Sequence, residues 1–234
     1  MYAVFKKEFR SSMTGMTGPI FIFAVLFVLG FFVQGIQLSG SPKVELSVVN
    51  GAFWSLILTP ILTMRLFSEE RKTRTDQLLY ALPISTTSVV LGKYFAMVAI
   101  FAIPCAVLAL YPVLFAFFAP AGMNFIMAYG AIIAYFLLGC AVIALGMLIS
   151  SLFESQVICA ILNLAILLAL YFLTSSASAF SGIIAKVVSA ISLFNPIIAF
   201  AYDTFDITCF VYYISVAALF IFLTVQSFEN RRWH

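Results

Sequence analysis

Long apolar stretches separated by short polar segments dominate this 234-residue sequence. A helix needs about 20 mainly apolar residues to cross a membrane. The pattern therefore predicts an all-α, polytopic membrane protein with six transmembrane helices. The first stretch is longer than the apolar core of a signal peptide and lacks a small-residue cleavage site, so we expect it to be retained. The six spans are expected at residues 18–38, 49–67, 94–118, 125–151, 157–174 and 207–228.

The composition supports a membrane protein. Hydrophobic residues make up 64% of the chain and charged residues 9%, against about 45–50% and 25% in soluble domains. So few charges could not cover a soluble protein that contains 26 Phe and 10 Tyr. This excludes an ordinary soluble enzyme and a disordered scaffold. The net charge of +3 is small and its basic residues flank the spans, so no nucleic-acid partner is expected.

Lys and Arg in the short loops predict the orientation, because cytoplasmic loops are enriched in them. With a cytoplasmic N-terminus, six spans also place the C-terminus in the cytoplasm, and only Lys43 and Lys186 then face outside. We expect a plasma-membrane protein with both termini inside. The basic residues on that side are Lys6, Lys7, Arg10, Arg65, Arg71, Lys72, Arg74, Lys93, Arg231 and Arg232.

The N-terminal segment, residues 1–17, has helical periodicity of its own. Tyr2, Phe5, Phe9 and Met13 fall on one stripe, with the basic residues away from it. This predicts an amphipathic helix in the cytoplasmic headgroup layer. A basic topology signal without such a helix is the alternative.

Residues 68–92 form the most charged segment between two spans. Eight of the chain's charged side chains lie from Arg65 to Lys93, whereas topology needs only one or two basic residues. The charges precede an apolar LLYAL patch and Pro83, which would end a helix over about 69–82. We expect an element that docks a soluble partner. A solvated loop is the alternative.

Residues 175–206 form an apolar segment on the outer side that is interrupted by Lys186 and Pro196. Apolar residues recur at helical spacing at Ile183, Ile184, Val187, Val188 and Ile191. A re-entrant or interfacial hairpin fits this pattern. Counting the segment as a seventh span would move Arg231 and Arg232 outside, against the charge bias.

Catalytic motifs are missing from the sequence. The single histidine is His234, so histidine-based metal and Ser–His sites are excluded. The P-loop pattern is absent, because Gly92 and Lys93 are followed by Tyr94 and no Gly lies five positions before Gly92. We expect no enzyme activity from this chain alone, and no directly bound metal or cofactor. Four cysteines without paired spacing fit buried apolar positions: Cys105, Cys140, Cys159 and Cys209.

The predicted span interiors hold no ionisable side chain, which argues against an ion-coupled carrier. The energy for any transport would then enter through the charged cytoplasmic segment. For Asn163 we expect a hydrogen bond between helices, and contact with cargo is the alternative. The neutral polar candidates for a translocation path are Gln34, Gln37, Asn50 and Asn163.

Three segments resemble the membrane subunits of ABC-2 type transporters, in particular the gliding-motility and nitrous-oxide-reductase-maturation permeases. They follow one another in the family's order and lie across most of the chain. The segments are PILTMRLFSEERKTRTDQLLYALPISTTSVVLGKYFA at 60–96, SSLFESQVICAIL at 150–162 and FNPIIAFAYDTFDITCFVYYISVAALFIFLTVQSFENRRW at 194–233.

The resemblance implies a single permease domain over 1–234, with residues 68–92 as the coupling segment between helices two and three. It implies two permeases, identical or paralogous, paired with two cytoplasmic ATPase subunits that bind ATP and Mg. An extracytoplasmic accessory subunit is a further possibility. The coupling residues implied are Glu69, Glu70, Arg71, Arg74 and Asp76 for polar contacts, Leu78, Leu79 and Leu82 for packing, and Glu154 and Gln156 for a second, smaller contact.

The sequence departs from the family pattern at Phe153, where Thr is common, and at Arg74, where a small residue often stands. These departures concern the choice of partner rather than the architecture. The resemblance predicts an ATP-driven exporter. A membrane anchor or assembly factor that recruits a soluble protein through residues 68–93 and transports nothing is the alternative.

Overall fold

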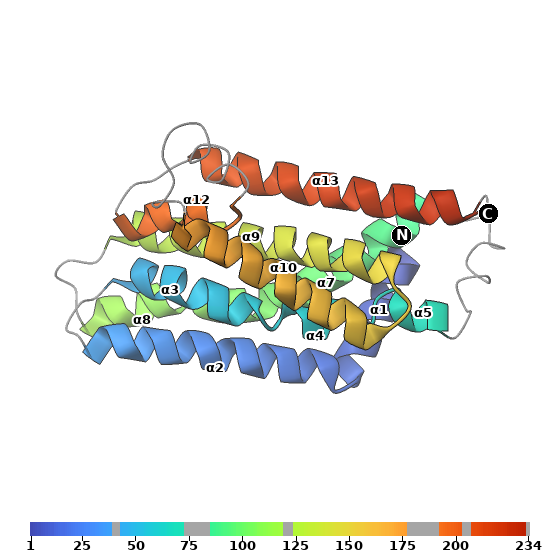
Figure 1. The fold of residues 1–234 in the computed structure, drawn as a ribbon. Coiled ribbons are helices and arrows are strands. Elements are labelled where there is room, and N and C mark those ends of the chain that lie inside the picture. The colour runs from blue at the N-terminus through green and yellow to red at the C-terminus, as the bar shows by residue number, and fades with distance from the viewer. Residues whose placement is uncertain (39–42, 73–84, 119–123, 177–191, 203–206, 233–234) are drawn as a thin grey trace.

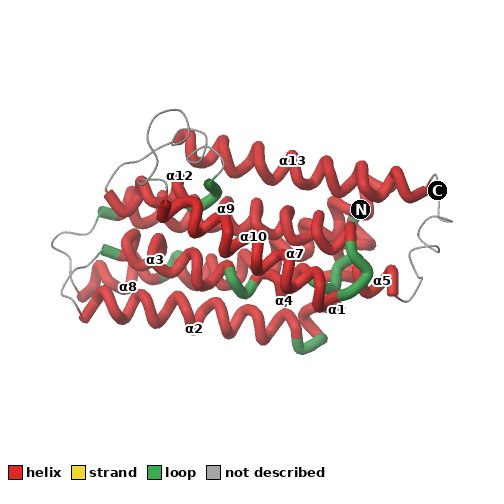
Figure 2. Tube along the Cα trace, in the orientation of Figure 1, coloured by secondary structure: helices red, strands yellow, loops and turns green. Residues whose placement is uncertain are grey.

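The computed structural model describes residues 1–38, 43–72, 85–118, 124–176, 192–202 and 207–232. In these residues the regular structure is helical, and short loops join the helices (Figure 2). The α-helices are α1 (Tyr2–Thr14), α2 (Thr17–Leu38), α3 (Val44–Leu56), α4 (Thr59–Thr63), α5 (Ser68–Lys72), α7 (Thr86–Leu108), α8 (Tyr111–Phe118), α9 (Phe125–Leu152), α10 (Gln156–Ser176), α12 (Asn195–Ile198) and α13 (Ile207–Arg232), and a 3₁₀-helix, η2, covers Ala199–Tyr202.

The helices agree with the predicted all-α membrane architecture. Five are long and apolar enough to cross a membrane, and a sixth span results if the bent pair Val44–Leu56 and Thr59–Arg71 is counted as one. Four of the six predicted spans start within one residue of the observed helices α2, α9, α10 and α13. The third differs most, since α7 begins at Thr86, eight residues before the predicted start at 94.

The second predicted span, 49–67, is not one straight helix. It bends by 47° between α3 and α4. Pro60 lies in the first turn of α4, where a backbone N–H has no partner within the helix. A proline, which lacks this N–H, is therefore tolerated there. The bend therefore has an identifiable cause in the sequence, and it changes the direction of the chain on its way to α5.

Helix α9 occupies the centre of the bundle. In its most apolar stretch 78% of the residues are buried, against 17–33% in the other four long helices. Small residues such as Gly139 and Ala141 allow neighbouring helices to approach closely. The Tyr135 hydroxyl lies 2.8 Å from Ser55 Oγ on α3, and the Tyr94 hydroxyl of α7 donates to the Cys140 carbonyl. Packing and hydrogen bonds together therefore fix α3 and α7 against α9.

The two ends of the bundle differ (Figure 1). The start of α1, helix α5 and the end of α13 lie together at one end, which we call the terminal end. The C-terminal ends of α2, α8 and α10 lie at the other, which we call the loop end. Of the predicted outer segment 175–206, residues 177–191 and 203–206 lie outside the described residues. Its described part returns to the bundle through α12 and η2, with Phe194, Ile197 and Phe200 buried.

The predicted N-terminal helix is present as α1. Three residues of its apolar stripe, Phe5, Phe9 and Met13, pack against the buried core, whereas Tyr2 and Lys7 are exposed. The helix is seated closely on α7, because a Cβ at Gly92 would come within 3.0 Å of the Met1 carbonyl oxygen. The stripe therefore attaches α1 to the protein itself.

Candidate functional site

A buried lysine lies at the terminal end of the bundle. Lys93 is in the second turn of α7, and its side chain is 2% exposed. Its Nζ donates to the Leu66 carbonyl oxygen at 2.5 Å and lies 4.7 Å above the ring centre of Phe67. Both contacts come from the segment that joins α4 to α5. The ammonium group thus holds the chain just before α5.

Two carboxylates face this ammonium group from different helices. Lys93 Nζ lies 2.7 Å from Glu70 Oε1 on α5 and 3.8 Å from Glu8 Oε1 on α1. We call Glu8, Glu70 and Lys93 the ionic cluster. A charge shielded from water interacts more strongly with its partners than a surface charge does. The cluster therefore ties α1, α5 and α7 together at one point.

The backbone before α5 is also fixed from α9 and α13. The Ser150 hydroxyl on α9 accepts hydrogen bonds from the N–H groups of Phe67 and Ser68, at 3.1 and 3.3 Å. The Phe67 ring packs on Phe228 of α13, with 4.8 Å between ring centres. These contacts satisfy backbone donors that have no partner within the short helix. Contacts from α9 and α13 thus hold the backbone just before α5.

The structure brings the described part of the predicted coupling residues to this end. Glu69 is exposed, Glu70 is half-buried in the ionic cluster, and Arg71 is 8% exposed. Residues Arg74, Asp76, Leu78, Leu79 and Leu82 lie outside the described residues, so the structure does not place them.

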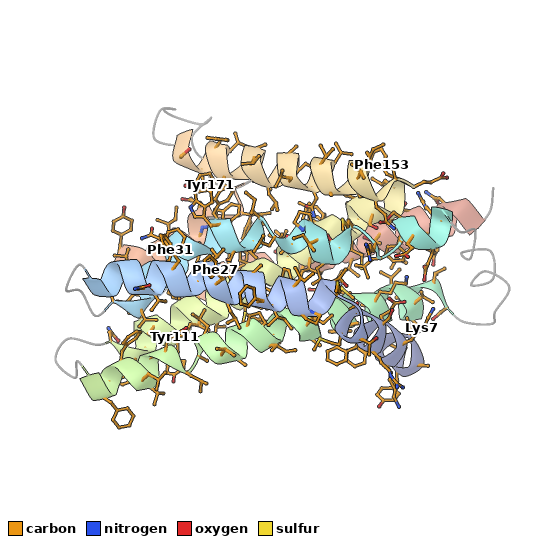
Figure 3. All side chains as sticks on the ribbon, turned by 90° about the horizontal axis from the view of Figure 1, so that it is seen from below. Lys7, Phe27, Phe31, Tyr111, Phe153 and Tyr171 are labelled. Carbon is orange, nitrogen blue, oxygen red and sulfur yellow. The ribbon has the colours of Figure 1, made fainter. Side chains whose placement is uncertain are left out.

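The second predicted contact lies in the turn between α9 and α10. Glu154 is exposed in this turn, and Gln156 opens α10 and is half-buried. Helix α10 contacts α5, so the turn and α5 share one face of the terminal end. Phe153, which departs from the family pattern, is exposed beside Glu154 and lies towards the same end as Lys7 (Figure 3).

The side chains of three predicted path residues, Gln34, Asn50 and Asn163, are described, and their surroundings differ. Gln34 is exposed on α2, and the side chain of Gln37 is not described. Asn163 is buried on α10 and donates from Nδ2 to Thr63 Oγ1 of α4 at 3.3 Å. This is a hydrogen bond between helices, made where Gly146 of α9 leaves room for it.

Asn50 is exposed on α3 and lines a cavity of about 200 Å³ near the loop end. An aromatic group forms part of the wall. Phe53 stacks on Tyr171 with 3.8 Å between ring centres, and Phe194 meets both rings edge-on. Tyr171 lies well away from Phe153 along α10 (Figure 3). Of the predicted polar residues, Asn50 is thus the one that borders a described cavity.

The sequence interpretation missed the ionic cluster and was wrong about ionisable groups in the spans. Lys93 lies within the candidate span Thr86–Phe117, and Glu45 is buried in the first turn of α3. The helical periodicity around Lys93 could have indicated its burial. Val90, Lys93 and Met97 fall on one helical face, and all three are buried. A lysine on an apolar helical stripe indicates a buried partner, and Glu8 and Glu70 supply it.

The described residues contain no group of three or more His, Cys, Asp or Glu side chains that could hold a metal ion. The four cysteines are buried, free thiols. The contacts at the terminal end join a charged surface segment to several long helices.

Comparison with known proteins agrees with these features. A family model described as "ABC-2 family transporter protein" matches residues 43–228. The match includes α5, Lys93 and the turn at Glu154. No curated protein matches the chain.

Proposed function

Because the chain belongs to the ABC-2 family of transporter proteins, we propose that it forms the translocation path of an ATP-driven exporter and is coupled to separate ATPase subunits through residues 68–92. The family match and the apolar helices establish a multi-pass membrane protein and an ABC transporter permease. Permeases of this family are membrane components that work with ATPase subunits and are not themselves catalytic. The direction of transport, the coupling segment and the dimer are the proposal.

The ionic cluster is the observation that carries this proposal. A partner that pushes on residues 68–92 acts on α5, and α5 is bound to α7 through the 2.7 Å contact of Glu70 with Lys93. The Ser150 hydrogen bonds extend the same connection to α9. Motion of an ATPase on nucleotide binding would therefore reach the long helices as a rigid-body displacement. We assign the polar contacts to Glu69, Glu70, Arg71, Arg74 and Asp76, and the packing to Leu78, Leu79 and Leu82.

The exposed turn at Glu154 supports a second contact with the ATPase. Glu154 and Gln156 lie on the same face as α5, so one soluble subunit could reach both. This face would then be cytoplasmic. Both ends of the described chain also lie at this end (Figure 1), which agrees with the distribution of Lys and Arg.

A second permease, identical or paralogous, would complete the path. Helices α10 and α13 bury only 17% and 22% of their most apolar stretches within one chain. Their remaining surfaces face lipid or another membrane protein. ATP binding and hydrolysis, with Mg, belong to the ATPase subunits.

The first test is purification from native membranes in mild detergent, with co-eluting proteins identified by mass spectrometry. We expect a P-loop ATPase in stoichiometric amount. Glu154→Lys should lower the recovery of the ATPase, whereas Tyr202→Lys, an exposed position beyond α12, should leave it unchanged. Reproducible absence of an ATPase from an intact, monodisperse chain would favour a membrane anchor that recruits another protein.

The second test separates coupling from assembly. Glu70→Gln keeps the other assigned contacts and should still assemble with the ATPase, but the loss of the Glu70–Lys93 ion pair should leave the permease unable to alter the rate of ATP hydrolysis in proteoliposomes. A Glu70→Gln complex whose hydrolysis rate responds to the permease as the wild type does would contradict the assigned route through α5.

A further inference from the structure

A polar pocket of about 240 Å³ lies where α1 meets the start of α2. Glu8 and Ser12 of α1 line one side, Thr17 opens α2, and Arg65 and Glu69 line the side formed by α4 and α5. The apolar residues Ile61, Leu62, Leu66 and Met97 also line the pocket. The pocket therefore combines charges of both signs with apolar side chains.

The pocket lies at the depth where two candidate spans end. The apolar span of α2 begins at Thr17, and the bent span of α3 and α4 ends at Arg71, a few residues beyond Arg65. Apolar spans begin and end at the boundary between hydrocarbon and headgroups. A molecule in this pocket would consequently occupy the headgroup layer of one leaflet.

An apolar stripe continues from the pocket along α2. Met16 borders the pocket. Ile20, Phe23, Phe27 and Phe31 follow at helical spacing, and each is between 52% and 73% exposed. The Phe23 and Phe27 rings stack on one another, and Figure 3 labels Phe27 and Phe31 along the helix. The stripe gives an acyl chain a surface that starts directly beside the polar pocket.

From this arrangement we propose that the pocket binds the phosphoethanolamine headgroup of a membrane phospholipid, with an acyl chain along the α2 stripe. The phosphate would pair with the Arg65 guanidinium beside Thr17, the first residue of α2. The primary ammonium group would donate hydrogen bonds to the Glu8 carboxylate. The proposal does not depend on the coupling function, because it needs only a membrane boundary at this end.

The charges also predict the selectivity of the pocket. An anionic headgroup has no cation to offer Glu8 and Glu69, and its own charge would be repelled by both carboxylates. A phosphocholine headgroup carries a cation without an N–H donor, so it loses the hydrogen bonds to Glu8. Phosphatidylethanolamine should therefore bind more tightly than phosphatidylglycerol or phosphatidylcholine.

Native mass spectrometry of the delipidated chain can test this by counting the lipids retained after addition of each of the three. We expect one retained phosphatidylethanolamine per chain, with an affinity at least about tenfold above the other two. Glu8→Gln should reduce this preference, because it removes the carboxylate that the ammonium group meets, and Arg65→Gln should lower the retention of all three lipids, because each carries a phosphate. Arg10→Gln removes an exposed arginine of α1 outside the pocket and should leave the preference unchanged. Equal retention of the three lipids by the wild type, wild-type retention in Arg65→Gln, or wild-type selectivity in Glu8→Gln would overturn the proposal.

One further variant and one competition experiment complete the test of lipid binding. Ser11→Phe fills the pocket from α1 without removing a charge, and should exclude the lipid even if Arg65→Gln fails to fold. Inorganic phosphate and glycerophosphoethanolamine are added as competitors for the bound lipid. Competition by glycerophosphoethanolamine alone supports a headgroup site, whereas equal competition by phosphate shows an anion site and refutes the lipid assignment.

Discussion

Replacing Lys93 by Met tests the ionic cluster most directly. The substitution keeps most of the side-chain length and removes the ammonium group. Glu70 then loses its partner at 2.7 Å, and the Leu66 carbonyl oxygen loses a donor. Removing one member of a buried ion pair costs about 3–5 kcal/mol. The Glu70 and Glu8 side chains are 18% and 17% exposed, so water can solvate them in part, and we expect the lower limit, about 3 kcal/mol.

Thermal unfolding in detergent measures this loss. For a chain of this size about 1 kcal/mol corresponds to about 2–4 °C in Tm, so Lys93→Met should lower Tm by about 6–12 °C. Lys7→Met is the matched control, because Lys7 is exposed on α1 and should change Tm little. The double variant Lys93→Met/Glu70→Gln should lose clearly less than the sum of the two single losses, because the carboxylate left without a partner is also removed.

Two results would refute the reasoning. If Lys93→Met keeps the wild-type Tm, the ammonium group does not hold α5 and α7 together. If the two substitutions add to within about 0.5 kcal/mol, Lys93 and Glu70 do not interact in the folded protein. Either result would also remove the basis of the proposed coupling route.

Three further predictions concern the packing of the helices. Gly146→Ala should destabilise the protein by about 1–3 kcal/mol, because its Cβ would lie 2.5 Å from Thr63 Oγ1; Gly30→Ala, with open space around it, should cause no loss of stability, and equal Tm values for the two variants would contradict the packing. Tyr135→Phe should cost about 0.6–1.7 kcal/mol, since it removes the hydroxyl that meets Ser55, and a Tm unchanged from the wild type would count against this bond. The four cysteines should resist maleimide in the folded protein and react after denaturation, because all are buried free thiols; rapid labelling of the native chain would contradict their burial.

The span positions were predictable because a membrane helix is specified by length and apolar composition alone. Helices α9 and α13 begin where the sequence places them. The bend at Pro60 was not predicted, although the residue is visible in the sequence. A single proline changes the average hydropathy of a 20-residue stretch very little, but it removes a backbone donor and so decides where a helix breaks.

The contacts of α1 and Lys93 could not be predicted from the local pattern of apolar and charged residues. An apolar stripe shows that one face of a helix is buried, but it does not show whether lipid or protein covers it, and in α1 Phe5 and Phe9 are covered by protein. In the sequence, Lys93 resembles the other basic residues that flank the spans and set the topology. Only the approach of α1 and α5 from distant parts of the chain makes it a buried cation, and this approach depends on tertiary packing.

The burial of α9 has a consequence for how many chains a route across the membrane requires. A bundle with a tightly packed helix along its axis offers no room for a solute on that axis, since 78% of the most apolar stretch of α9 is already enclosed by neighbouring helices. If the chain forms the translocation path as proposed, the path follows the outer surface of the bundle, where this chain supplies only one wall. Lipid or a second permease would then supply the other wall.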